Sequence, residues 1–186
     1  YSLAAHLYEL WAAATLQQAK ATMTSEATQM AYRAEELFRI AGTFHARVAD
    51  GTSPPEAAAR ILWQAARDFV QGRGYLQAVN ALECLLATGV TGDLRANALA
   101  LACSALESCR RVETVYEVAA MCVAEFPNHS ATATACYHLA RCQIATGDLA
   151  SAATNLKAIL NTGPSDTDPA ILQQTRLILA HLLTDQ

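Results

Sequence analysis

The chain has little of what nucleic-acid binding or β-structure requires. Lys20 and Lys157 are its only lysines, and the arginines form no cluster. Nucleic-acid phosphates call for clustered positive charge, so we expect no nucleic-acid partner. The net charge of −4 comes from 17 acidic and 13 basic residues that are interspersed along the chain. Clusters of valine, isoleucine and aromatic residues at a period of two are also missing, which argues against strands.

Sequence motifs that carry chemistry are missing too. The chain has no glycine-rich phosphate loop, H-E-x-x-H, G-x-S-x-G or C-x-x-C motif. The segment Gly72-Arg73-Gly74 is typical of a turn between two helices. Five scattered histidines do not suggest a metal site: His6, His45, His129, His138 and His181. We therefore predict a protein that is not an enzyme and that has no metal and no cofactor.

The cysteines indicate packing rather than cross-linking. All six lie in predicted helices, at positions 84, 103, 109, 122, 136 and 142. We interpret them as reduced, buried side chains that act as small hydrophobic residues. Reduced cysteines favour the cytoplasm. A periplasmic or membrane-anchored full-length protein stays open, because the chain begins at Tyr1 and is expected to be a fragment.

What the chain does have is alanine and a helical period. Apolar residues make up 53% of it, with only 8 glycines and 5 prolines, which suits closely packed helices. We predict about nine helices. The expected spans are about 2–22, 25–49, 53–71 and 75–87, two helices between 93 and 126 that meet near 109–111, then 130–146, 149–160 and 168–183.

Capping residues set several of these limits. Ser53 and Glu56 form a predicted capping box, Asp93 and Ser130 are predicted N-caps, and Gly147 suits a left-handed C-cap. The first helix is too short and too polar to span a membrane. We interpret it as an amphipathic helix that buries one apolar stripe: Leu3, Leu7, Leu10 and Ala14.

A repeat appears when the chain is shifted against itself by about 37 residues. Leu62, Leu99 and Cys136 then fall in register, as do Leu86, Val123 and Leu160, and Pro127 and Pro164 end the second and third copies. A period of this size is typical of stacked helical hairpins, which usually present a binding surface.

These residues resemble the tetratricopeptide repeat family. The third copy is most similar to it, with Leu139-Ala140, Thr146-Gly147-Asp148-Leu149, Ala152, Leu156 and Pro164. The resemblance implies an all-α, right-handed α-α superhelix of about four hairpins with a C-terminal capping helix. The implied domains are an N-terminal hairpin at 1–52, three repeats within 53–169 (about 59–95, 96–132 and 133–169), and a capping helix or truncated repeat at 170–186.

The resemblance also implies a concave surface lined by the first helix of each hairpin. Its partner-binding residues would be Arg60, Trp63, Gln64, Arg67, Asn97, Ser104, Tyr137, His138 and Arg141. Aromatic and arginine side chains are frequent at binding hot spots, and guanidinium groups bind carboxylates. We predict a protein-interaction scaffold that binds a partner peptide or protein segment, such as an acidic segment, in this groove.

Three further points limit this prediction. The lysine and asparagine set by which family members hold chaperone C-termini is missing, so a chaperone adaptor is disfavoured. Direct membrane insertion is not expected. A structural assembly module that forms homo-oligomers through its end helices, or a regulatory helical domain of a larger chain, stays an alternative. Exposed apolar residues on the first or last helix would favour assembly.

Overall fold

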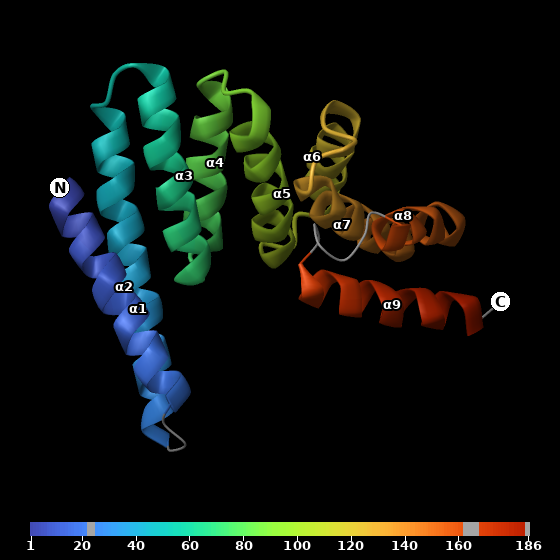
Figure 1. The fold of residues 1–186 in the computed structure, drawn as a ribbon, viewed down its shortest axis with the longest axis horizontal. Coiled ribbons are helices and arrows are strands. Elements are labelled where there is room, and N and C mark those ends of the chain that lie inside the picture. Colours follow the sequence, from blue (N-terminus) through green and yellow to red (C-terminus); the bar gives the residue numbers. More distant parts are fainter. Residues whose placement is uncertain (22–24, 162–167, 185–186) are drawn as a thin grey trace. The chain divides into compact units, whose positions relative to one another are not determined.

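The computed structural model describes residues 1–21, 25–161 and 168–184, and all secondary structure within them is helical (Figure 1). The predicted all-α class with about nine helices is confirmed for these residues. The helices are α1 (Ser2–Ala21), α2 (Ser25–Asp50), α3 (Pro55–Gln71), α4 (Tyr75–Ala87), α5 (Gly92–Ser108), α6 (Val112–Glu125), α7 (Ala131–Thr146), α8 (Leu149–Asn161) and α9 (Pro169–Thr184).

The chain divides into two compact units, Tyr1–Val90 and Thr91–Gln186. The first contains α1 to α4 and the second contains α5 to α9. Each unit has its own buried core, and each is described separately below.

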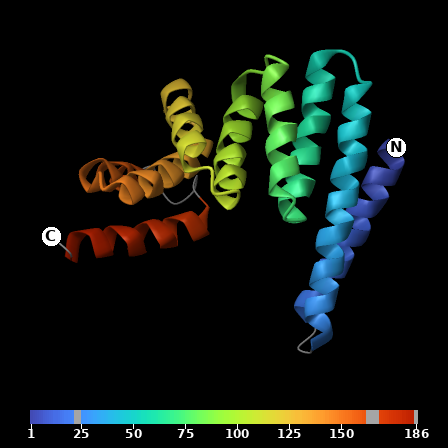
Figure 2. The same cartoon turned by 180° about the vertical axis from the view of Figure 1, so that it is seen from behind.

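In the first unit, α2 packs against both α1 and α3. Its buried face includes Ala34, Leu37, Phe38 and Ala41. In the two views of the ribbon, α1 and α2 run side by side along their length (Figure 2). The α3–α4 turn, predicted at residues 72–74, is also confirmed, and it lies against α2 where Arg39 Nη1 donates to the Gly72 carbonyl oxygen at 2.6 Å.

The prediction for α1 is wrong about which face is buried. Leu3, Leu7 and Leu10 are 73%, 57% and 54% exposed, and Ala14 is exposed as well. The buried residues of α1 are smaller: Ala5, Ala12, Thr15 and Ala19. Both sets repeat at the helical period on opposite sides of the helix. The small set faces inward because alanines let α1 approach α2 closely.

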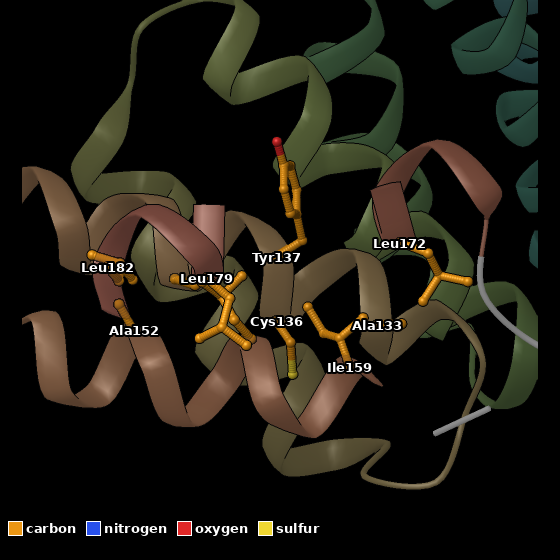
Figure 3. Close-up of a cluster of buried hydrophobic side chains, with 10 residues drawn as sticks. Ala133, Cys136, Tyr137, Ala152, Ile159, Leu172, Leu179 and Leu182 are labelled. Atoms are coloured by element: carbon orange, nitrogen blue, oxygen red, sulfur yellow. The ribbon is translucent and has the colours of Figure 1, made fainter. Parts of the chain in front are cut away.

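In the second unit, α5 pairs with α6 and α7 pairs with α8, while α5 also contacts α7. Helix α9 packs on α8 and touches α7. Its buried residues Leu172, Leu179 and Leu182 join a cluster with Cys136 of α7 and Ile159 of α8 (Figure 3). The hydrophobic face of α9 thus completes the core between α7 and α8.

Two predicted N-caps are wrong, and a third is confirmed in its position only. Helix α3 begins at Pro55 with Pro54 before it, and Ser53 makes no cap. Asp93 lies inside the first turn of α5 and makes no side-chain cap. Ser130 does occupy the position before α7, but its side chain makes no cap hydrogen bond. His129 Nδ1 accepts the Ala131 amide at 3.0 Å instead.

Other predicted helix ends are confirmed. Gly147 ends α7 with φ of +84°, in the left-handed region that suits glycine. Asp168 precedes α9, and its Oδ1 accepts the Ala170 amide at 2.8 Å. The predicted closing residue Pro164 lies outside the described residues.

The cysteine prediction holds for four of the six. Cys103, Cys122, Cys136 and Cys142 are buried and unlinked, whereas Cys84 is exposed and Cys109 is partly exposed at the end of α5. Burial raises the pKa of each of the four buried thiols, that of Cys122 to about 11. These four therefore behave as small hydrophobic side chains.

None of the helices within the described residues combines the length and hydrophobicity that crossing a lipid bilayer needs.

Candidate functional site

The residues predicted to line a groove fall into both units. Arg60, Trp63, Gln64 and Arg67 belong to α3 in the first unit. The others belong to α5 and α7 in the second unit: Asn97, Ser104, Tyr137, His138 and Arg141. The two sets make different contacts, so each set is described separately.

On α3, two arginines have no polar partner among the residues that the structure describes. Arg60 and Arg67 are exposed, and neither makes a hydrogen bond or ion pair with any other described residue. They lie seven residues apart on one face of the helix, which separates them by about 10 Å. Trp63 is half-buried beside them. This face can offer two guanidinium groups and an indole ring to a ligand.

Gln64 belongs to a different environment from that of the arginines. Its Nε2 donates to Glu9 Oε1 of α1 at 2.6 Å and lies 3.4 Å from Asp68 Oδ1. Asp68 is fully buried, and its Oδ2 lies 2.8 Å from His45 Nδ1 of α2. Burial raises the pKa of Asp68, and the hydrogen bond from His45 partly offsets that rise. These four side chains connect three helices, so Gln64 is structural.

This network was not predicted from the sequence. Asp68 sits among Ala65, Ala66 and Phe69 of the buried helix face, where a carboxylate is costly unless it is hydrogen-bonded. A charged residue at a core position is the one signal that could have drawn attention to it.

In the second unit, four of the predicted residues come together. Ser104 Oγ lies 3.0 Å from His138 Nε2, and His138 Nδ1 lies 2.7 Å from Glu107 Oε2. Arg141 Nη1 is 2.9 Å from Glu107 Oε1, and its guanidinium lies 5.7 Å from the centre of the Tyr137 ring.

Two further residues belong to this cluster of the second unit and were not predicted from the sequence. Glu107 lies one turn after Ser104 on α5, and Gln174 of α9 accepts a hydrogen bond from the Tyr137 hydroxyl at 2.5 Å. The spacing of Glu107 from Ser104 could have revealed the first. Asn97, the remaining predicted residue, is half-buried and does not take part in the cluster.

The contacts of Ser104, His138 and Glu107 follow the order of nucleophile, base and acid in serine hydrolases. Ser104, however, lies inside α5, where the neighbouring backbone amides are engaged in helical hydrogen bonds. They cannot stabilise an oxyanion, which that chemistry requires. Burial also lowers the pKa of His138, while Glu107 acts in the opposite direction. The geometry is that of a polar connection between α5 and α7.

The contact with Glu107 makes Arg141 less available to bind a partner than its sequence position suggested. Its guanidinium is paired with Glu107 and packed on Tyr137, so its charge is already balanced. A carboxylate from a partner would have to displace Glu107. The free positive charge among the predicted residues is therefore that of Arg60 and Arg67.

Helix α1 carries exposed apolar residues at helical spacing, which we call the α1 leucine stripe: Leu3, Leu7, Leu10 and Ala14. Trp11 lies next to it, 49% exposed, with the Arg33 guanidinium 5.1 Å from its ring centre. A shallow hollow of about 880 Å³ lies between α1 and α2 and is lined in part by Trp11, Tyr32 and Arg33.

Among the described residues, no three histidine, cysteine, aspartate or glutamate side chains are placed to hold a metal ion. A scan against models of known protein families gave no match, and a search of curated proteins gave none either.

Proposed function

We propose that the chain is a protein-interaction module, not an enzyme, that binds other proteins through exposed helix faces on a tetratricopeptide-like, right-handed superhelix of hairpins. The observation that carries this proposal is the exposure of the α1 leucine stripe, which also favours the alternative of an assembly module, since both bind protein through an exposed helix face. Large apolar patches on a folded surface usually mark places where another protein docks.

The stripe is not needed for the fold of its own unit. The inner side of α1 is already filled by Ala5, Ala12 and Ala19, which are almost completely buried. Complete burial of a leucine is worth about 1.5–3 kcal/mol. The three leucines are mostly exposed to water, so burying them against a partner would contribute favourable free energy to binding.

The spacing of the stripe also indicates the shape of the partner. Leu3, Leu7, Leu10 and Ala14 follow one another at intervals of four, three and four residues. This is the seam of a coiled coil, which fits side chains of a second helix between its own. We infer that α1 receives an apolar helix.

Site-specific photo-crosslinking tests this function. A photoreactive amino acid would replace Leu7 in cells that make the natural protein, and a control protein would carry it at Leu76 of α4, which is exposed to a similar degree at 53%. We expect discrete protein adducts from position 7 and few from position 76. Equal or no adducts at both positions would contradict the proposal.

A second binding face is supported by α3. Arg60 and Arg67, which have no ion-pair partner within the described part of the chain, present two charges about 10 Å apart, with Trp63 beside them. An acidic segment in the polyproline II conformation has three residues per turn, so carboxylates three residues apart lie on one side of it, about 9 Å from each other. We infer that this face binds acidic segments of partner proteins, as part of the concave surface that the repeat resemblance implies.

Charge reversal on α3 tests the second face. A peptide with acidic residues three apart would be titrated against the protein, with Trp63 fluorescence as the signal. Replacing Arg60 and Arg67 by glutamate should weaken binding at least about tenfold. The control, Arg47→Glu, reverses an exposed arginine of α2 that makes no ion pair with another described residue, and it should change binding little. Equal losses in both variants would show only a general effect of net charge.

A further inference from the structure

We propose that the second unit binds a small neutral alcohol or phenol in a cavity between α6, α7 and α8. The α1 leucine stripe and the α3 arginines belong to the first unit, so this site goes beyond the proposed function and does not depend on it. Three features carry the inference: the size of the cavity, its apolar walls and one hydrogen-bond acceptor that the fold leaves unused.

The cavity has room for one ring. Its volume is about 190 Å³, whereas an apolar cavity of about 150 Å³ is enough to bind benzene. Voids larger than a water molecule are few in a packed domain. Pro127 and Ala158 line the cavity and are both exposed, so a ligand can enter from that side.

The walls of the cavity are mainly apolar. Ala133 and Cys136 of α7 are buried and lie beside Ile159 of α8 (Figure 3). Burial raises the pKa of Cys136, so its thiol stays neutral. Among the described residues that line the cavity, none is an aspartate, glutamate, lysine or arginine. Moving an ionised group from water into such a site is costly, so the cavity favours a neutral ligand.

One polar atom of the walls accepts no hydrogen bond within the described part of the chain. Asn155 Nδ2 donates to Gln143 Oε1 at 2.8 Å, which leaves Asn155 Oδ1 as an acceptor. The Thr132 hydroxyl and His129 Nδ1 are already hydrogen-bonded to the backbone, and His129 Nε2 lies 3.5 Å from Asp93 Oδ1. A ligand hydroxyl can donate to Asn155, whereas water is held well only by two to four polar partners. The ligand is therefore apolar with one hydroxyl group.

Methyl NMR tests the site in the full chain. The compound p-cresol would be titrated against protein with ¹³C-labelled isoleucine methyl groups, and toluene and benzoate would be compared with it. We expect a saturable shift of Ile159, with Ile40 and Ile61 of the first unit unchanged. Toluene lacks the hydroxyl and should bind at least about threefold more weakly, and benzoate should cause no shift.

Two variants fill the cavity from different helices. Cys136→Leu adds volume from α7, and Ala158→Leu adds it from α8 at an exposed position, where folding is less at risk. Each should weaken p-cresol binding at least about tenfold. The control Cys109→Leu changes a partly exposed cysteine that does not line the cavity and should leave binding unchanged. Asn155→Leu should remove the preference for p-cresol over toluene. Circular dichroism checks that the helices of each variant are intact.

Three results would overturn the site. The first is the lack of a saturable shift at Ile159, or equal shifts at all isoleucines. The second is full binding in both folded filling variants, which would place the ligand elsewhere. The third is equal affinity for p-cresol and toluene in the natural protein, which would remove the hydroxyl from the ligand class.

Discussion

Replacing Leu7 or Leu10 by alanine should reduce stability only slightly, although both are large apolar residues at the helical period. More than half of each side chain is exposed. Complete burial of a leucine contributes about 1.5–3 kcal/mol, so less than half of that is at risk. Alanine also has the higher helix propensity. We expect each variant to lose less than about 1 kcal/mol of unfolding free energy.

The inner face of α1 should respond in the opposite way. Ala12 has no exposed area, so Ala12→Leu must push α1 away from α2 and should cost about 1–3 kcal/mol. Leu85, also without exposed area, provides the reference for a core leucine in the same unit. Its replacement by alanine should cost about 2–5 kcal/mol.

Urea unfolding followed by circular dichroism measures all four variants. The reasoning predicts small losses for Leu7→Ala and Leu10→Ala and large losses for Ala12→Leu and Leu85→Ala. If Leu7→Ala and Leu10→Ala lost as much as Leu85→Ala while Ala12→Leu lost nothing, the leucines would face inward and the proposed docking face would not exist.

Three further predictions concern the turn after α3 and the cluster between α5 and α7. Gly72→Ala should destabilise the protein by about 1–3 kcal/mol in urea unfolding, because its Cβ would lie 2.6 Å from the Glu35 carbonyl oxygen, whereas Gly51→Ala, with no atom within 4 Å, should have little effect. Burial lowers the pKa of His138, so the unfolded chain binds the proton first and stability should fall as the pH drops through about 6.5; urea unfolding at several pH values should show this fall flattened in His138→Gln. A fluorophosphonate probe should leave Ser104 unlabelled, as read by mass spectrometry, because the backbone amides beside it in α5 are engaged in helical hydrogen bonds; rapid labelling that is lost in Ser104→Ala would contradict the non-enzymatic proposal.

The sequence predicted the helices well because local chemistry determines where they stop. Gly147 supplies the left-handed end of α7, and Pro127 follows α6, where a helix cannot continue. The N-caps were less predictable. A serine or aspartate near a helix start satisfies the pattern, but Ser53, Asp93 and Ser130 show that the pattern does not guarantee the hydrogen bond.

The face of α1 could not be predicted because the sequence holds two stripes of equal period. Larger apolar residues are usually buried, which favoured Leu3, Leu7 and Leu10. The close approach of α1 to α2 through alanines reverses this preference, and it is a property of the pair of helices. A sequence read one helix at a time does not contain it.

The candidate arginines differ in their ion pairs, and this difference also depends on contacts between helices. Arg60, Arg67 and Arg141 look equivalent in the sequence, yet Arg141 is paired with Glu107 and the other two are unpaired among the described residues. The partner of Arg141 is 34 positions earlier on another helix, so only the packing of α5 against α7 reveals it. The repeat register predicts which face of a helix a residue occupies. It does not predict which side chains that residue contacts.

Protection of α1 in the cell tests the proposed docking face most directly. A cysteine at position 7 and a matched cysteine at position 76 would each be labelled with a maleimide, once in dilute purified protein and once in cells that make the protein. Both should react quickly in the purified protein, and only position 7 should be protected in cells, where its partner covers it. Equal labelling of the two positions in cells would contradict the proposal that α1 binds a protein.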